Sequence, residues 1–579
     1  MNLLEYIIFT VLVISNIALG LYFSFGKKQR DGTTDEMFLG ERNIPTFALA
    51  VSVLATMMSA IGVIGFTAHF YAYGIHILWF IPTMFLTLPL VTHVITPVLY
   101  KLQITSIFEY LRLRFGNKLG VAASVLYFFF AQSLGALAVH ASSLAVSTVF
   151  HVPLIWSSFA IGLTATIYTA LGGLRSVVWT DCMQTVIIVS GIATIFIKVG
   201  YDSFFHPRHH LSFQEMRPYF LNASFDLTQD ENIWANLIGL AAMGIFRTGI
   251  DQATVQRYLA ARTLKDARRT AWFGTAMIGV YFIVNMALGL VMTYWYRDCD
   301  PELSGEISTH DQIIPFYVVR NLANFPAFSG IFLAGIVGAT TSTTSSLINS
   351  LTAICYIDIA SQVFKITETS SKKVTKGIAF AIGILMTCYA IIIPYMGSTS
   401  RVLMIVQGCI TGPFVGLFLM ALLFPHQNAM LPLCPGGVLF SSHLIFSKYN
   451  SQAAAVSAVL TTLWQTWNTL AHMTYGIGPP RMMASLEMCP QYINKTSAFT
   501  SISLNEQGYT LIATNFFARQ GQMDSFTLSA YWSSLFSTLT TIAVGLLLSW
   551  LTGDYKKYHG NLYLTSNVFL KLWVKTKLI

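Results

Sequence analysis

The sequence predicts an all-α polytopic membrane protein with about 13 transmembrane helices, and two observations carry this prediction. Charged residues make up only 10% of the 579 residues and hydrophobic residues 54%, against about 25% charged residues in an ordinary soluble domain. Such a chain has too few polar side chains to cover a water-facing surface. Long apolar runs also recur along it, and a bilayer core needs roughly 20 apolar residues for each helix that crosses it. The composition therefore argues against a soluble enzyme, a nucleic-acid binder and a disordered scaffold.

The apolar runs give the expected spans in chain order. Each is long enough to cross the hydrocarbon core as a helix, whose backbone groups bond to one another. The runs lie at 5–24, 45–74, 76–97, 119–147, 153–172, 178–200, 233–259, 270–296, 326–361, 373–394, 397–424, 452–472 and 526–551.

The distribution of charge predicts which side of the membrane each loop faces. Lys27, Lys28 and Arg30 follow the first span, so we expect an extracellular N-terminus and, after an odd number of spans, a cytoplasmic C-terminus. With this assignment about 24 of the 34 Lys and Arg residues, Arg257 among them, lie in cytoplasmic loops or the tail. The net charge of +9 then records topology and does not indicate an acidic partner.

The same assignment makes predictions about the external loops. The glycosylation sequons at Asn222 and Asn494 both fall in loops expected outside, where N-glycans are added. Cys299 and Cys489 are the two cysteines expected in external loops, where thiols can oxidise. We therefore expect a disulfide between them.

Two glycine-containing stretches predict interrupted helices, at 59–65 in the second span and 243–252 in the seventh. Their spacing is expected if spans 2 to 6 and 7 to 11 are inverted repeats, each opening with a discontinuous helix that lines a midplane site. The alternative is that these glycines only permit close helix packing, as we expect for Gly408, Gly412 and Gly416 in the eleventh span.

The ninth span contains a dense run of hydroxyl side chains: seven of the eight residues from 339 to 346 are Ser or Thr. Sodium is a hard cation that binds several oxygens, and a helix can offer hydroxyls and freed carbonyls without burying a full negative charge. The alternative is that the hydroxyls bond back to their own helix or join neighbouring helices.

At these residues the sequence resembles the sodium:solute symporter family, and specifically its animal monocarboxylate, multivitamin and iodide branch. The TALGGL and DQxxxQRYL patterns are specific, and the matching stretches keep their order along almost the whole chain. They are 50–74, 97–115, 168–184, 251–262, 299–301 with 311–315, 329–349 and 532–553.

The resemblance implies a leucine-transporter-type core of two inverted five-helix repeats with flanking helices. The expected divisions are 1–44 for an extra N-terminal helix and cytoplasmic loop, 45–200 for the first repeat, 201–232 for an extracellular loop, 233–424 for the second repeat, 425–451 for a cytoplasmic loop, 452–551 for two C-terminal helices with an extracellular loop, and 552–579 for a cytoplasmic tail.

The resemblance also implies a sodium site formed by five residues of the second and ninth spans: the carbonyls of Ala55, Met58 and Ala339, and the hydroxyls of Ser342 and Thr343. Sodium is the coupling ion, and no other cofactor is implied.

Three further residues are implied near the ion path. Asp181 matches a carboxylate near the sodium exit path; the alternative is a capping or topology role at a helix terminus. Ser345 and Ser346 are candidates for a second sodium site.

Departures from the family pattern concern the solute. Gly62 stands where relatives often carry a polar residue, which weakens a sugar or iodide interpretation. Arg247, on the seventh span, could hold a carboxylate substrate or instead pair with Asp251 one turn on. Gln407 is a second candidate contact, with helix packing as its alternative. Residues 431–450 match nothing in the family and form an unusual insertion.

We therefore expect a plasma-membrane symporter that couples sodium entry to import of a small organic solute by alternating access. A monocarboxylate or carboxylate-bearing vitamin is the favoured solute; iodide, a sugar, a sodium-gated channel and a substrate sensor are the alternatives. The expected partners are sodium, the solute and membrane lipid, with no nucleic acid. No enzyme motif appears. His69, His76, His93 and His140 show no evident carboxylate partner for proton coupling.

Overall fold

The computed structural model describes residues 3–25, 34–205, 211–322, 325–364, 367–395, 399–424, 450–475, 481–489, 527–551 and 562–575. Within these ranges the chain is helical, without strands, and a single parallel bridge joins Ile44 to Ala261. Nine helices in the described part of the chain are long and apolar enough to cross a membrane, or ten if one bent pair is counted as a span. The all-helical membrane class is therefore confirmed.

The principal helices follow the apolar runs. Their bounds are α1 Leu3–Phe25, α2 Thr34–Leu39, α3 Thr46–Met57, α4 Thr67–Tyr73, α5 Phe80–Leu90, α6 Thr96–Leu102, α7 Ile107–Phe115, α8 Asn117–Phe150, α9 Leu154–Phe205, α10 Phe213–Met216, α11 Ala241–Ile245, α12 Gln252–Leu259, α13 Leu264–Tyr296, α14 Ile313–Asn321, α15 Phe328–Ile354, α16 Ser361–Val363, α17 Glu368–Ile392, α18 Thr399–Leu423, α19 Asn450–Tyr475, α22 Ala530–Leu551 and α23 Asn567–Lys575.

The runs at 153–172 and 178–200, expected as separate spans, form α9, which bends at Gly173. Gly173 has φ +63° and ψ −171°, and a Cβ there would lie 2.9 Å from the Met37 carbonyl oxygen. Only glycine adopts this conformation in so little space. The residue therefore lets two helical segments meet at an angle without an intervening loop.

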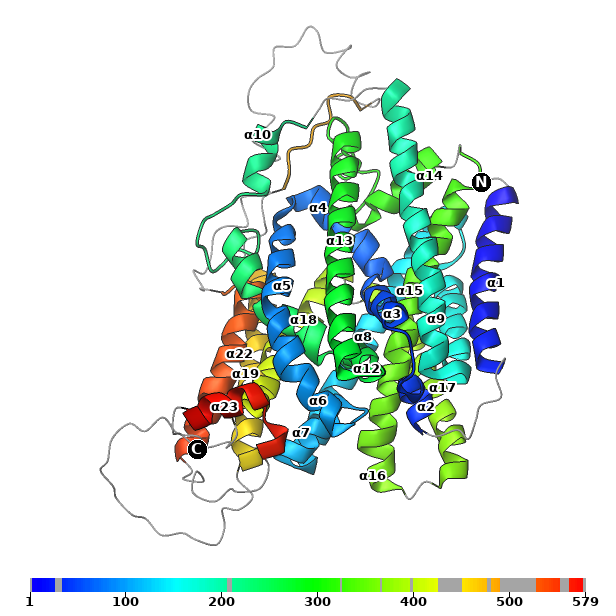
Figure 1. Cartoon of the computed structure of the whole chain (residues 1–579). Coiled ribbons are helices and arrows are strands. Elements are labelled where there is room, and N and C mark those ends of the chain that lie inside the picture. The colour runs from blue at the N-terminus through cyan, green and yellow to red at the C-terminus, as the bar shows by residue number, and fades with distance from the viewer. Residues whose placement is uncertain are drawn as a thin grey trace.

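Helix α15 forms the centre of the bundle (Figure 1). Its residues from Phe332 to Ile354 are buried, and it packs against α9, α8, α1 and α17. Helices α18, α19 and α22 pack together as a group on one flank. Gly412 and Gly416 of α18 lie against α22, where an added Cβ would clash with Ser537 and Thr541. Close packing is confirmed for these two glycines.

The second and seventh spans are both interrupted. Helix α3 ends at Met57, Met58 has φ −76° and ψ 72°, and the chain resumes as a π-helical segment at Gly62. The two halves, Thr46–Met57 and Gly62–Tyr73, are bent by 63°. In the seventh span a π-helical segment, Phe246–Ile250, ends at Asp251, which is extended and caps α12 by accepting from the Ala253 N–H.

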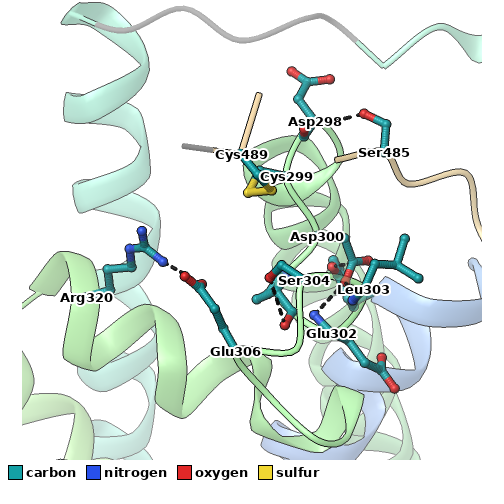
Figure 2. The surroundings of a disulfide bond; sticks show 12 residues. Asp298, Cys299, Asp300, Glu302, Leu303, Ser304, Glu306, Arg320, Ser485 and Cys489 are labelled. Carbon is teal, nitrogen blue, oxygen red and sulfur yellow. Dashed lines mark hydrogen bonds and ion pairs between the residues drawn. A yellow bond between two sulfur atoms is a disulfide. The ribbon is translucent and has the colours of Figure 1, made fainter. Parts of the chain in front are cut away.

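A strap, residues 481–489, crosses one end of the bundle near α4 and α13, as the orange segment at the top of Figure 1 shows. Cys299 and Cys489 form the expected disulfide (Figure 2). The Met482 N–H donates to the Ala72 carbonyl at 2.7 Å, so the strap also satisfies a carbonyl in the last turn of α4. The strap thus joins α4, in the second half of the broken second span, to the loop after α13.

Side chains reinforce this junction. Arg481 of the strap lies 2.9 Å from Asp300 and 2.8 Å from Glu302, both in the loop after α13. The Tyr71 hydroxyl of α4 donates to the same Asp300 carboxylate at 2.8 Å. Asp300 is buried, so it links the strap, the loop and α4 through charged hydrogen bonds in a sheltered setting.

Candidate functional site

At the break in the second span, the backbone N–H groups that would normally donate to two helix carbonyls donate elsewhere. In an uninterrupted helix the N–H groups of Ser59 and Gly62 would donate to the carbonyls of Ala55 and Met58. Here the Ser59 N–H donates to the Met57 carbonyl at 2.9 Å, and the Gly62 N–H donates to the Ser59 hydroxyl at 3.1 Å. The break therefore releases two buried oxygens, and they belong to the two carbonyls expected to bind sodium.

Helix α15 brings its hydroxyls to α3 at this level. The Thr343 hydroxyl donates to the Thr56 carbonyl at 3.4 Å, and the Ser342 hydroxyl donates to Asp181 at 2.6 Å. Ala339 lies one turn earlier on α15 and is fully buried. The structure thus brings the expected residues of α3 and α15 into one buried region.

Asp181 lies inside α9 and not at a helix terminus, so the alternative of a capping role is wrong. Its fully buried carboxylate accepts hydrogen bonds from the hydroxyls of Ser52 and Ser342 and pairs with Arg257 at 3.2 Å. One carboxylate therefore connects α9 with α3, α12 and α15.

The assignment of Arg257 to a cytoplasmic loop is wrong. Its side chain is fully buried and donates to Ser52 at 2.7 Å, to Ser346, and to the Ala253 carbonyl, besides pairing with Asp181. Counting basic residues loop by loop cannot show whether a basic side chain pairs with a buried acid. The sequence did indicate that Arg257 is buried in the membrane, because it lies within the expected span 233–259.

Three other hydroxyls of α15 make the bonds expected under the alternative, in which hydroxyls bond to their own helix or to neighbouring helices. Ser345 donates back to the Ser342 carbonyl at 2.9 Å, and Thr341 donates to the carbonyls of Val337 and Gly338. Ser346 instead accepts from Arg257 and from Thr56. The run of hydroxyls therefore serves both to satisfy its own helix and to join neighbouring helices.

Arg247 is paired within the seventh span. Its Nη1 lies 3.2 Å from Asp251, and its Nη2 donates to the Met57 sulfur at 2.8 Å. Asp251 is almost fully buried and accepts from the Tyr127 hydroxyl of α8 as well. The ion pair considered as one alternative for Arg247 is present, and the guanidinium also contacts the last residue of α3.

Gly62 and Gln407 occupy different surroundings. Gly62 lies at the break, where an added Cβ would be 2.5 Å from the Tyr281 hydroxyl. Gln407 is half-buried on α18, and its carbonyl accepts from Thr411. No hydrogen bond among the described residues joins the Gln407 side chain to Gly62 or Arg247.

At the strap end of the bundle, His69 of α4 has a carboxylate neighbour, contrary to expectation. Its Nε2 lies 4.0 Å from Glu231, while His472 of α19 lies 3.8 Å from Asp230. Burial, followed by the charge of Asp230, raises the pKa of Glu231 to about 8. These acids lie outside the membrane-spanning helices and bring α4 and α19 into one titratable cluster.

Two expectations for external loops differ in their outcome. Asn222 is described: its Oδ1 accepts from the Ser224 hydroxyl at 2.7 Å, and its Nδ2 donates to the Glu231 carbonyl. Asn494 and all of the insertion at 431–450 except its last residue lie outside the described residues.

Sequence reasoning missed four side chains at the two broken helices: Ser52, Tyr127, Arg257 and Tyr281. Three of them are tied to Asp181 or Asp251 by long-range contacts, and Tyr281 faces Gly62. Arg257 could have been noticed because it lies inside an expected span. No local sequence pattern indicates that the other three side chains belong to the site.

Two interrupted helices around buried oxygens and paired charges are typical of secondary membrane transporters. The chain belongs to the sodium:solute symporter family, whose model matches residues 37–431. It is therefore a transporter and not an enzyme.

The chain is similar to transporters of known name and, in its fold, to one solved structure. Sodium-coupled monocarboxylate transporter 2 of Mus musculus is 28% identical over 562 residues, covering 95% of this chain and 84% of the relative. The sodium-dependent multivitamin transporter of Oryctolagus cuniculus is also 28% identical, covering 96% and 83%. A Na⁺-coupled sialic acid symporter in a substrate-bound, outward-open state has a TM-score of 0.70 at 20% identity, covering 95% of this chain and 98% of that one. The similarity to the sialic acid symporter is a similarity of fold alone.

Proposed function

We propose that this protein imports a small carboxylate solute together with sodium by alternating access. The observation that carries the proposal is the pair of carbonyls released at Ala55 and Met58, beside the hydroxyls of Ser342 and Thr343. A hard cation needs such a set of oxygens, and an apolar membrane core offers few others.

The hydroxyls are oriented in a way that suits a cation. Ser342 directs its hydrogen to Asp181 and Thr343 directs its hydrogen to the Thr56 carbonyl. A hydroxyl that donates its hydrogen elsewhere keeps two lone pairs for an ion. We therefore assign Ala55, Met58, Ala339, Ser342 and Thr343 to sodium and Asp181 to its exit path.

A second sodium at Asp181, Ser345 and Ser346 would compete with Arg257. The guanidinium already bonds to Asp181 and Ser346, and a second cation there would be repelled at short range. Binding of a second ion therefore requires Arg257 to withdraw, and the ratio of charge moved to solute taken up reports whether it does.

Arg247 is assigned to the solute carboxylate. Its Nη2 donor now contacts the Met57 thioether, which is a weak acceptor, so a carboxylate oxygen gains by displacing it. The pair with Asp251 fixes the guanidinium while this exchange takes place. Gly62 lies beside the same site, and Gln407 is assigned a secondary contact.

The transport cycle follows from two inverted repeats, 45–200 and 233–424, that open with the interrupted spans and rock against each other. For the other segments of the chain and for the thirteen spans we propose the bounds predicted from the sequence. We also propose that the protein lies in the plasma membrane with an extracellular N-terminus. Glycans are proposed at Asn222 and Asn494. One sodium carries about 2.3 kcal/mol per 100 mV, and each tenfold sodium gradient adds about 1.4 kcal/mol.

The test is uptake of labelled lactate, butyrate, pantothenate, biotin, iodide, glucose and choline by cells that express the protein, in sodium and in choline medium. Sodium-dependent uptake of a carboxylate is expected. Equal uptake in both media excludes sodium coupling, and a sodium current without uptake of any probe favours the channel.

A further inference from the structure

The break in the second span is faced by a polar group that the assignments above leave unused. Tyr281 lies in the middle of α13, and its hydroxyl is 2.5 Å from the position that a Cβ would take at Gly62. The same Cβ position is 3.5 Å from the Met57 carbonyl oxygen. The Tyr281 hydroxyl therefore lies where the chain of the second span is unwound.

This hydroxyl is buried and has no hydrogen-bond partner among the residues that the structure describes. Burying a hydroxyl without a hydrogen-bond partner is unfavourable, because the group loses its bonds to water. Such hydroxyls are therefore rare unless a water molecule or a ligand bonds to them. Asn285, one turn along α13, uses its Nδ2 on the Tyr281 carbonyl and leaves its own side-chain oxygen unpaired. This part of α13 thus contains two side-chain groups, the Tyr281 hydroxyl and the Asn285 amide oxygen, that could bond to a ligand.

Tyr281 and Arg247 both lie close to Met57. The Arg247 guanidinium contacts the Met57 sulfur, whereas the Tyr281 hydroxyl lies near Gly62 and the Met57 carbonyl. A phenol and a guanidinium are both donors, and the two oxygens of a carboxylate accept from both.

We propose that Tyr281 is a solute-binding residue whose hydroxyl donates to a solute oxygen at the break, and that Gly62 is required because any side chain there displaces this hydroxyl. The proposal rests on the proposed function and adds to it a second donor, on α13, for a small carboxylate. It also explains the missing side chain at position 62: the polar group comes from α13 instead.

The principal test is Tyr281→Phe, with labelled butyrate, lactate and pantothenate as probes. Because the hydroxyl has no hydrogen-bond partner of normal geometry among the described residues, we expect its loss to leave thermal stability unchanged. The KM for the transported probe should rise about tenfold or more, the effect of losing a hydrogen bond to a charged group. The sodium concentration for half-maximal uptake at saturating probe should not change.

Tyr317→Phe is the matched control, because Tyr317 is also buried with an unpaired hydroxyl in the described structure but lies on α14, away from the break. Its KM should equal that of the wild type. Equal KM values for Tyr281→Phe and the wild type would overturn the inference.

A double-mutant cycle distinguishes loss of the Tyr281 hydrogen bond to the solute from a packing effect at Gly62. Gly62→Ala places a methyl group against the hydroxyl, so its KM should also rise. In Gly62→Ala/Tyr281→Phe the clash is gone, because the nearest ring carbon is 3.5 Å away. The double variant should therefore match Tyr281→Phe alone, and additive losses would contradict the shared mechanism. If the wild type takes up no carboxylate with sodium, the proposed function fails and the inference fails with it.

Discussion

Single side chains at the two broken helices have distinguishable roles, because each has a different set of partners. Ser342 and Thr343 point toward α3 and Asp181, whereas Ser350, two turns further along α15, bonds back to the Leu347 carbonyl. The first two can serve an ion and the third serves its helix.

Ser342→Ala combined with Thr343→Ala should raise the half-saturating sodium concentration about thirtyfold, since the two proposed oxygen ligands are lost at a cost of roughly 1 kcal/mol each. Sodium titration of uptake measures this. Ser350→Ala is the control on the same helix and should behave as the wild type. An unshifted titration in the double variant would remove these residues from the sodium site.

Arg247→Gln should raise the KM for a carboxylate probe by about tenfold to a hundredfold, because a charged hydrogen bond contributes about 1.5–3 kcal/mol. The measurement is concentration-dependent uptake at saturating sodium. Arg320→Gln breaks an exposed pair with Glu306 and serves as the control. Equal uptake by Arg247→Gln and the wild type would leave the pair with Asp251 as the only role of this arginine.

Arg257→Met should destabilise the protein by about 3–5 kcal/mol, because it leaves the Asp181 carboxylate buried without its counter-ion. Thermal unfolding in detergent measures the loss. Adding Asp181→Leu removes the orphaned charge, so the double variant should recover much of the stability. A double variant as unstable as Arg257→Met would show that packing, and not charge, dominates.

At the scale of elements, the breaks were predictable and their contacts were not. Glycines and polar residues inside apolar runs marked both interrupted spans, since such residues weaken a helix locally. The partners of Asp181, Asp251 and Gly62 come from helices distant in the sequence, and hydropathy carries no information about which helices meet. Arg257 shows the same limit, because a loop-charge count cannot detect a buried pair.

The cluster at the strap end of the bundle predicts a dependence of stability on pH. The pKa of Glu231 is raised to about 8 in the folded protein, against an ordinary value of about 4.3 when unfolded. The folded state therefore binds the proton more tightly, and this contribution to stability falls as the pH rises from about 4.3 and is gone above about 8. The melting temperature should be lower at pH 8.5 than at pH 6.

Glu231→Gln should reduce this difference, because glutamine is neutral at both values. Asp230, His69 and His472 lie beside Glu231 and are kept unchanged in this comparison. A pH dependence of the same size in Glu231→Gln would show that Glu231 is not its source.

At the scale of the whole molecule, the start of α1 and the C-terminal α23 lie at opposite ends of the bundle (Figure 1). The strap and its disulfide share the end where α1 begins, which agrees with the extracellular side proposed for the N-terminus. The predicted topology requires these features to lie on one side of the membrane, and the structure places them at one end of the bundle.

An epitope tag before α1 should be labelled by antibody on intact cells, whereas a tag after α23 should be labelled only after permeabilisation. Asn222→Gln should also increase the mobility of the glycosylated protein in gel electrophoresis. A tag at the C-terminus accessible on intact cells would reverse the proposed topology or change the parity of the spans.

The strap has a mechanical consequence for the helices outside the repeats. It belongs to the segment between α19 and α22, yet it bonds to the last turn of α4 and is covalently linked to the loop after α13. Any swing of α4 must therefore pull on this segment or break its bonds. In the proposed transport cycle, α4 therefore moves either together with the strap and the loop after α13, or only by breaking the hydrogen bond between Met482 and Ala72.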